Sequence, residues 1–533
     1  MNTTTKTDRA GGWLFIGLCI LLLVQGVARF AVQPAAGHVL DDWSYSAQAG
    51  KFPSAWATLV GGLRHPLRPF LHGVQLSVHR WFGICHAGYI PLSLLGYSVA
   101  LVLFVLFVRE LTGKARSALV AGLLFALLPN MCGHFHWLCV AIAFGLFGQP
   151  MYLLSAWCLV RYARRGGGWN LAVAAIGYFF GIGTYEVGVF LPVAYAVLLW
   201  GRGWGKWFWA MFPFGLALAV YAIWRLTFGF GYGWSWFGIP PQTAVGLSLW
   251  ELKHTLAGIV SWWGGVNWWR AVADGTRGFV ELPWSAVALL MLANAALLAA
   301  LGGAMAKMDD PNRNEEQSGV PPFGPGRLAL FGLVWVGATY LPGILGYLVP
   351  RINYLPGAGM ALLAALALGC VRMDRLLFPL LLLAFAGMVV AEGDTKNWAD
   401  SIRFQQNMFA TMQELRDDWE NSEILWLDTR ELSQRMTPGI LDGNCHHIDT
   451  IAEYRNAGFL RGFAPSAMAE LILEGKPGPQ VVLDVEYGAH EEDGVLKWHE
   501  RYIPEKPFET PMARVFRLDV LDAGTRSSTD VRN

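Results

Sequence analysis

Charged residues are scarce in this sequence. Only 15% of the 533 residues are Asp, Glu, Lys or Arg, whereas a soluble globular domain carries about 25%. Hydrophobic residues make up 54%, and the mean hydropathy is +0.38. A chain of this composition has too little charge for an ordinary soluble protein, so the sequence predicts an integral membrane protein.

An excess of one charge sign is also lacking. The 40 Lys and Arg residues against 39 Asp and Glu give a net charge of +1, which offers no basic surface for a nucleic acid. The seven cysteines are scattered and form no Cys-x-x-Cys pair, so the sequence indicates neither a zinc ribbon nor a disulfide framework. His134 and His136 supply only two ligands, and we expect no metal.

Long apolar runs are abundant instead. A run of about 17–25 mostly apolar residues can cross the roughly 30 Å of hydrocarbon in a bilayer. About eleven such runs are predicted, at 12–31, 88–108, 115–131, 137–160, 169–184, 187–200, 207–227, 283–304, 327–348, 353–371 and 375–391. The first follows Lys6 and Arg9 and has no persuasive small-residue cleavage site, so we expect an uncleaved span.

Basic residues set the orientation of these spans. They gather near the N-terminus and then in alternate short connections, at Arg109, Lys114 and Arg116, at Arg161, Arg164 and Arg165, at Arg202 and Lys206, at Lys307, Arg313 and Arg327, and at Arg372 and Arg375. Because basic loops stay in the cytoplasm, the N-terminus is predicted to be cytoplasmic. The opposite face receives a first outer loop at 32–87, a Trp-rich outer loop at 228–282 and the C-terminal tail.

The tail changes character after the last apolar run and becomes rich in charge. Apolar residues between 398 and 419 follow helical spacing, 465–473 also reads as a helix, and 423–429, 480–485 and 513–520 read as strands. The sequence therefore predicts a transmembrane domain at 1–391 and a small α/β extracytoplasmic domain at 392–533.

The first outer loop carries the candidate chemistry. Asp41 and Asp42 follow the first span closely, where a carboxylate could act as general base at the membrane surface, although acidic pairs in loops are more often simply solvated. Further on, Arg68 stands next to Pro69 and near His65. Its guanidinium suits phosphate oxygens, or else binds lipid headgroups without specificity.

Two other features leave alternatives open. Glu186 lies in a short turn with apolar neighbours, where an unpaired carboxylate is costly, so we expect an arginine partner, either Arg68 or Arg351. Glu186 could equally form a structural ion pair or take part in binding the substrate. The tryptophans of the loop 228–282 could anchor in lipid, stack on a sugar or guide a lipid tail.

Several segments resemble GT-C-type membrane glycosyltransferases. The segments LRHPLRPFLHGVQLSVHRWFG (63–83) and AGYIPLSLLGYSVALVLFVLFVRELTG (87–113) are similar to the first-loop and second-span region of membrane O-mannosyltransferases that carry tetratricopeptide repeats. GTYEVGVFLP (183–192) resembles that family's Lys-Glu turn, with Tyr185 in place of the lysine, and PRINYLPGAGMALLAALAL (350–368) resembles its Arg-Tyr-x-Tyr-Leu-Pro stretch. The tail lacks the repeats. The wider group includes protein O-mannosyltransferases and lipid A aminoarabinose transferases.

The resemblance implies an α-helical polytopic membrane protein with a GT-C-like fold. It implies an inverting glycosyltransferase that moves a sugar from a polyprenyl-phosphate carrier to an acceptor hydroxyl on the extracytoplasmic face. Asp41 or Asp42 would be the base, and Arg68, Glu186, Arg351, His65 and Tyr354 would hold phosphate or substrate. No cofactor beyond the lipid-linked donor is expected, and the acceptor could be a glycan, a lipid or a protein.

Two rival functions remain at this stage. A transporter or lipid flippase would place ionisable residues near the membrane midplane, whereas Arg29 and Arg225 lie toward the outer ends of their spans. A non-catalytic scaffold would use its outer domain to bind a partner. The predicted site residues come from separate outer segments, and an interfacial active site requires them to meet.

Overall fold

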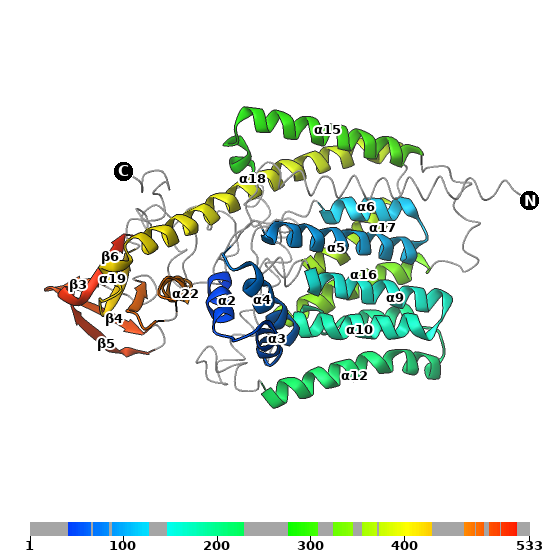
Figure 1. The fold of residues 1–533 in the computed structure, drawn as a ribbon. Helices are drawn as coiled ribbons and strands as arrows, with labels where there is room; N and C mark the ends of the chain where they lie inside the picture. Colours follow the sequence, from blue (N-terminus) through cyan, green and yellow to red (C-terminus); the bar gives the residue numbers. More distant parts are fainter. Residues whose placement is uncertain are drawn as a thin grey trace, which may run out of the picture.

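The structure of the protein is a computed structural model, and it describes residues 41–65, 68–84, 88–126, 146–228, 275–307, 323–344, 354–369, 373–428, 463–474, 476–483, 490–500 and 503–519. The described chain is mostly helical, with a small sheet region near the C-terminus. Figure 1 shows a helical bundle at one end, the sheets at the other, and three short helices between them.

The three short helices are α2 (Asp41–Gly50), α3 (Ala55–Leu63) and α4 (Pro69–Phe82). The side chain of Ser54 caps α3 by accepting a hydrogen bond of 3.1 Å from the backbone N–H of Ala57. Gly62 and Gly73 let α3 and α4 touch, because a Cβ atom on Gly62 would lie 2.5 Å from the Cα of Gly73. Helix α2 packs against α4 on one side and against the C-terminal domain on the other.

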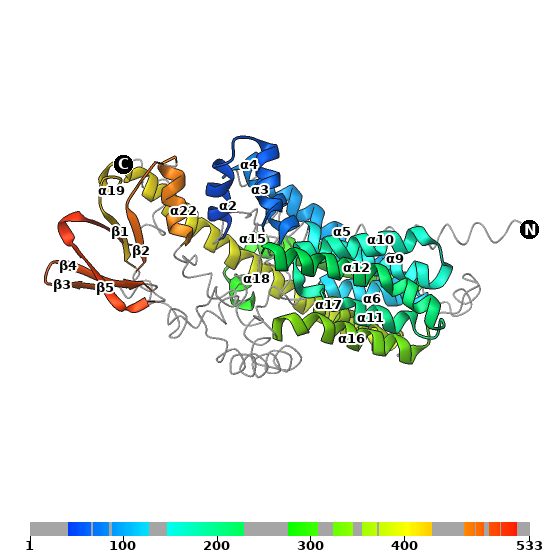
Figure 2. The same cartoon turned by 90° about the horizontal axis from the view of Figure 1, so that it is seen from below.

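The helical bundle consists of elements that run side by side in both views (Figures 1 and 2). They are α5 (Tyr89–Thr112), α6 (Ala115–Ala126), α9 (Gln149–Arg165), α10 (Gly168–Thr184), α11 (Leu191–Leu199), α12 (Trp204–Phe228), α16 (Pro325–Ile344) and α17 (Tyr354–Leu368). Buried aromatic rings fill its centre, among them Phe104, Phe107 and Trp335. Edge and stacked ring contacts of this kind stabilise a core beyond the burial of their area.

Two further helices lie against each other beside the bundle, α15 (Trp284–Lys307) and α18 (Met373–Glu414). Helix α18 contains 42 residues, which is about 63 Å of α-helix. Figure 1 shows it running from the bundle into the C-terminal domain, where α19 (Arg416–Trp419) follows. The predicted boundary between residues 391 and 392 therefore falls inside a continuous helix.

The described residues of the C-terminal domain form two three-stranded sheets. The first is parallel, with the order β2 (Gln480–Leu483), β1 (Ile424–Asp428), β6 (Val515–Asp519), and every residue of its central strand β1 is buried. Helix α22 (Phe463–Ile472) precedes β2. The second sheet is antiparallel, with β3 (His490–Glu492), β4 (Val495–Glu500) and β5 (Ile503–Pro511), and η9 (Met512–Arg514) leads on to β6.

These elements can be compared with the sequence-based expectations. The predicted α/β character of the tail is confirmed, with strands at β1, β2 and β6 and a helix at α22, whereas the antiparallel sheet was not foreseen. Most of the predicted apolar runs that fall in the described part of the chain form helices. The run at 12–31, and the loop 228–282 between residues 229 and 274, lie outside the described residues.

Two described helices are long and apolar enough to cross a membrane, Tyr89–Thr112 and Trp204–Arg225. Shorter apolar helices accompany them, including Ala115–Ala126, Glu186–Leu199 and Tyr354–Leu368. By length and composition alone, two such helices are weak evidence for a membrane protein.

Candidate functional site

A two-point ion pair joins α4 to the turn between α10 and α11. The Nε atom of Arg68 donates to Oε2 of Glu186 at 2.9 Å, and Nη2 donates to Oε1 at 3.0 Å. Arg68 is the N-cap residue of α4, and Glu186 opens the short helix η4 (Glu186–Gly188). The expectation that Glu186 pairs with an arginine is confirmed. About a quarter of each side chain is exposed, 29% for Arg68 and 25% for Glu186, so the pair reaches the surface.

Aromatic side chains hold this pair in place. The guanidinium carbon of Arg68 lies 3.9 Å from the centre of the Tyr185 ring, which is a cation–π contact. The hydroxyl of Tyr152 donates to the carbonyl oxygen of Tyr185 at 2.6 Å and accepts from the N–H of Gly188 at 3.2 Å. Tyr152 therefore fixes the backbone on both sides of Glu186.

The close approach of α4 to α10 depends on a small residue. A Cβ atom on Gly183 would lie 2.4 Å from the ring of Phe70, which is too short for a real contact. Phe70 follows Pro69 in the first turn of α4, and its ring also packs on Phe180 with centroids 4.6 Å apart. Glycine at 183 therefore lets the first turn of α4, and with it Arg68, reach Glu186.

The pair changes the acidity of both partners. Burial would raise the pKa of Glu186, but the charge and hydrogen bonds of Arg68 outweigh burial and lower it. Burial alone would lower the pKa of Arg68. The nearby charge of Glu186, followed by Tyr185, outweighs burial, and the pKa of Arg68 is raised. Both groups are consequently charged at neutral pH.

His65 and His72 stack on each other beside Arg68, with ring centroids 3.4 Å apart. Burial, and then the charge of Arg68, lower the pKa of His65 to about 4. Burial, followed by the influence of His65 and Arg68, lowers the pKa of His72 to about 2. Both imidazoles are therefore neutral at pH 7, and the positive charge at this point belongs to Arg68.

Two more residues come close to the ion pair from other helices. Tyr354, at the start of α17, is 1% exposed and lies near enough to Tyr185, Glu186 and Arg68 to interact electrostatically with them. Arg225, near the end of α12, interacts in the same way with Glu186. The structure thus brings together four of the predicted site residues, Arg68, Glu186, His65 and Tyr354, and adds Arg225. Arg351 lies outside the described residues.

Asp42 lies in a different cluster. Its carboxylate is fully buried, and its Oδ1 is 3.7 Å from Nε2 of His79, which is equally buried. The other ring nitrogen of His79 is 2.9 Å from the hydroxyl of Ser46 and 3.1 Å from that of Tyr89. Burial lowers the pKa of His79 to about 3, so this imidazole is neutral at pH 7. Asp41 opens α2, and its side chain is not among those described.

Helix α4 separates the two clusters. Arg68 caps its first turn and His79 stands in its last turn, and the 14 residues of α4 span about 21 Å. The ring of Tyr45 lies between them, 5.3 Å from the ring of His72 and 5.8 Å from that of His79. The structure therefore does not place Asp42 beside Arg68, and the predicted site extends along one face of α4.

His72 and His79 were not predicted as site residues. A usable signal was present, because His72 and His79 are spaced by seven residues in one helical stretch, and residues seven apart on a helix share a face. Among the described residues, no group of three or more His, Cys, Asp or Glu side chains could hold a metal ion. His134 and His136 lie outside that part of the chain.

No family model matches the chain, and no curated protein matches it.

Proposed function

We propose that this chain is a multi-pass membrane glycosyltransferase that takes a sugar from a polyprenyl-phosphate carrier and transfers it to an acceptor hydroxyl outside the cytoplasm. The observation that carries the proposal is the pairing of Arg68 with Glu186. These residues lie 118 positions apart, and each falls in a segment that resembles the GT-C-type enzymes. Their meeting at a partly exposed point is what an interfacial active site requires.

The membrane part of the proposal has support in the exposed side chains. One face of α12 presents large apolar residues to the surroundings, between 43% and 61% exposed, at Phe208, Phe212, Leu216, Val220 and Ile223. Soluble proteins rarely leave a continuous apolar stripe uncovered, whereas lipid covers it at no cost. Exposed tryptophans stand at helix ends, including Trp169, Trp200, Trp204 and Trp284, where indole rings favour the headgroup level.

The phosphate-binding role belongs to Arg68. Its Nε and Nη2 atoms bind Glu186, and the remaining face of the guanidinium has donors for a phosphate oxygen. Glu186 and Tyr185 hold the guanidinium at a fixed angle, which reduces the rotamer entropy lost when the donor binds. When the bond between the sugar and the phosphate breaks, negative charge grows on the phosphate, and a fixed cation stabilises that charge.

The role of general base rests on the resemblance, which assigns it to Asp41 or Asp42. We assign it to Asp41, because an acceptor hydroxyl cannot reach the fully buried carboxylate of Asp42. Asp42 and His79 then fix the position of α2. The base removes the proton of the acceptor hydroxyl as its oxygen attacks the anomeric carbon of the sugar, and the polyprenyl phosphate leaves from the opposite face, with inversion. This step requires the sugar to extend from the phosphate at Arg68 along α4 toward the start of α2.

The proposal is tested with the full chain in proteoliposomes that contain a radiolabelled polyprenyl-phosphate sugar. Release of polyprenyl phosphate is the measured quantity, with Arg68→Gln as the variant and Arg64→Gln as its matched control. Arg64 is an exposed arginine four residues away on the C-cap of α3. We expect release by the wild-type protein and by Arg64→Gln, and about a hundredfold slower release by Arg68→Gln.

The rival functions give other results in the same vesicles. A flippase moves the donor between leaflets without cleaving it, and a scaffold leaves it unchanged. If a panel of polyprenyl-phosphate hexoses and pentoses yields no cleavage with the wild-type protein, the transferase proposal is wrong.

A further inference from the structure

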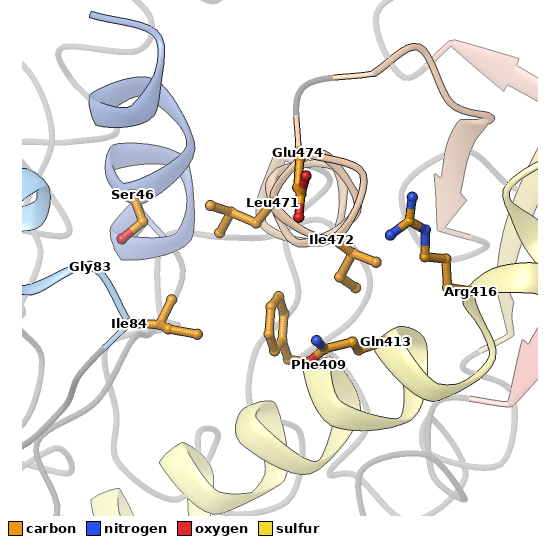
Figure 3. A pocket seen from close by; sticks show the side chains of 9 residues that line it. All are labelled: Ser46, Gly83, Ile84, Phe409, Gln413, Arg416, Leu471, Ile472 and Glu474. Atoms are coloured by element: carbon orange, nitrogen blue, oxygen red, sulfur yellow. The ribbon is translucent and has the colours of Figure 1, made fainter. Parts of the chain in front are cut away.

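A cavity of about 360 Å³ lies between α2, the start of the connection after α4, the end of α18 and the helix α22. Figure 3 shows its lining, in which Ser46 of α2 and Ile84 face the residues of α22 across the opening. Its size is at the lower end of the range for small-molecule sites, about 300–1,000 Å³. Six of its nine lining residues, three from α18 and α19 and three from α22 and the turn after it, follow residue 391, in the part of the chain that has no role in the mechanism so far.

The lining combines two kinds of side chain. Ile84, Phe409 and Leu471 provide apolar surface, and Gln413, Arg416 and Glu474 provide hydrogen-bonding groups around it. One face of the Phe409 ring stacks on Trp43, with centroids 4.9 Å apart, and the Nε1 atom of Trp43 donates to Gln405 on α18 at 2.8 Å. The aromatic wall of the cavity is therefore rigid.

The charges of the cavity restrict what it can bind. The carboxylate of Glu474 lines it, and the guanidinium of Arg416 is already paired with Glu420 at 3.0 Å, so neither an anionic nor a cationic ligand finds a full set of opposite charges there. An acyl chain would cover the side chains of Gln413 and Glu474 and supply no hydrogen-bond partner for them, which is costly. A neutral ligand with many hydroxyl groups and one apolar face satisfies both kinds of side chain, because hydroxyls donate and accept and sugar C–H groups pack on an aromatic ring.

The position of the cavity sets a minimum length for a ligand that also reaches Arg68. Ser46 lines it and bonds to His79 in the last turn of α4, and Gly83, directly after α4, lines it as well. Arg68, which would hold the donor phosphate, is at the other end of that helix, about 21 Å away by its 14 residues. A molecule that fills the cavity and also presents a hydroxyl near Arg68 must be longer than one sugar ring.

We propose that this cavity binds the distal end of a neutral oligosaccharide, which is the acceptor of the transfer reaction. The role of this saccharide as acceptor rests on the proposed glycosyltransferase function. The binding of a saccharide to the cavity does not depend on that function. The C-terminal domain then selects the acceptor, and the helical bundle binds the donor.

The binding test uses the full chain in nanodiscs and neutral gluco- and manno-oligosaccharides from disaccharide to hexasaccharide. Binding is measured by saturation-transfer NMR and by calorimetry, with charged oligosaccharides and a peptide as comparisons. We expect neutral saccharides to bind and affinity to rise with chain length. Phe409→Ala and Gln413→Ala should each weaken binding about tenfold.

The matched control for Phe409→Ala is Phe508→Ala. Phe508 also stacks on a buried tryptophan, Trp498, with centroids 4.5 Å apart, is more exposed than the half-buried Phe409, and does not line the cavity. Gln413 is an exposed residue on the same helix as Phe409, so its alanine variant tests the cavity even if Phe409→Ala folds poorly. Unchanged saccharide binding in Gln413→Ala, or preference of the wild-type protein for the peptide, would overturn the inference.

A second measurement separates this inference from the proposed function. Hydrolysis of the polyprenyl-phosphate sugar with water as acceptor requires Arg68 and not the cavity. We expect Gln413→Ala to keep this hydrolysis at the wild-type rate, while its transfer to the hexasaccharide at low saccharide concentration falls about tenfold, in line with its weaker binding. If saccharides bind but the wild-type protein hydrolyses no donor, the glycosyltransferase function and the acceptor role are wrong, and the saccharide site stands.

Discussion

Arg68 and Glu186 form a two-point ion pair at 2.9 and 3.0 Å although 118 residues separate them in the chain. The pair connects the short helices of the first loop to the helical bundle, and the ring of Tyr185 lies under the guanidinium. A contact of this geometry contributes both to stability and to the fixed position of a cation. The two contributions can be separated by substitution.

Replacing Glu186 with Gln is expected to lower the stability of the protein by about 2 kcal/mol, because it leaves the guanidinium of Arg68 partly buried without its counter-charge. The apparent melting temperature in detergent measures this effect. The double variant Arg68→Gln, Glu186→Gln should be less unstable than the sum of the two single variants. Strict additivity would show that the pair is not coupled.

Replacing Arg68 with Lys keeps the positive charge and removes the two-point geometry. We expect a modest loss of stability and at least a tenfold loss in the release of polyprenyl phosphate, since one ammonium group cannot bind Glu186 at two points and also stay on the Tyr185 ring. Release at the wild-type rate would show that charge alone is sufficient.

The two neighbouring aspartates are expected to differ. Asp41→Asn should abolish sugar transfer and leave the melting temperature close to that of the wild type. Asp42→Asn should lower the melting temperature, because the buried carboxylate and His79 lie 3.7 Å apart. Parallel activity and melting measurements on both variants decide the assignment, and full activity in Asp41→Asn would remove Asp41 from the mechanism.

Acid should destabilise the protein through its buried histidines. The folded-state pKa values of His65 and His79 are about 4 and about 3, below the ordinary value of 6.5. The folded state therefore binds fewer protons than the unfolded state, so stability is full above about pH 6.5 and falls as the pH drops toward these values. The lowered pKa of Glu186 acts in the same direction at lower pH.

Melting temperatures measured from neutral pH down to about pH 4 check this expectation. His79→Gln retains hydrogen bonding and cannot titrate, so its melting temperature should depend less on pH than that of the wild type. An equal pH dependence in the variant would show that His79 contributes nothing to the effect.

Gly183 is expected to tolerate no side chain. A Cβ atom there would lie 2.4 Å from the Phe70 ring, and overpacking of this kind costs about 1–3 kcal/mol. Gly183→Ala should lower the melting temperature and also slow the release of polyprenyl phosphate, because the first turn of α4 positions Arg68. Gly215→Ala is the control, since nothing lies within 4 Å of the corresponding position on α12.

Local sequence patterns predicted most of the helices, because long apolar runs and helical spacing are properties of short segments. The parallel strands β1, β2 and β6 were equally visible as short apolar runs. The sheet of β3, β4 and β5 was not visible, because its first strand is fully exposed and reads His490-Glu491-Glu492. Pairing with β4 stabilises that strand. Such pairing between distant segments cannot be recognised from the sequence of either segment alone.

The ion pair could be predicted because an isolated carboxylate among apolar residues requires a cation. The separation of Asp42 from Arg68 could not be predicted, since it depends on the direction in which α4 runs between them. The cavity beside Ser46 could not be predicted from the sequence for a similar reason. Its walls come from segments more than 300 residues apart, such as Ser46 and Phe409, which are joined only in the folded molecule.

Helix α18 continues without interruption from the bundle into the C-terminal domain. Pro379 near its start removes one backbone hydrogen bond, and from there the rod runs on to Glu414 with no loop between the bundle and the domain. Trp43 is fastened to the same rod through Gln405 and Phe409. Under the proposed function, the distance between the cavity and the ion pair sets a minimum length for the acceptor, and we expect shorter saccharides to stay unmodified however tightly they bind.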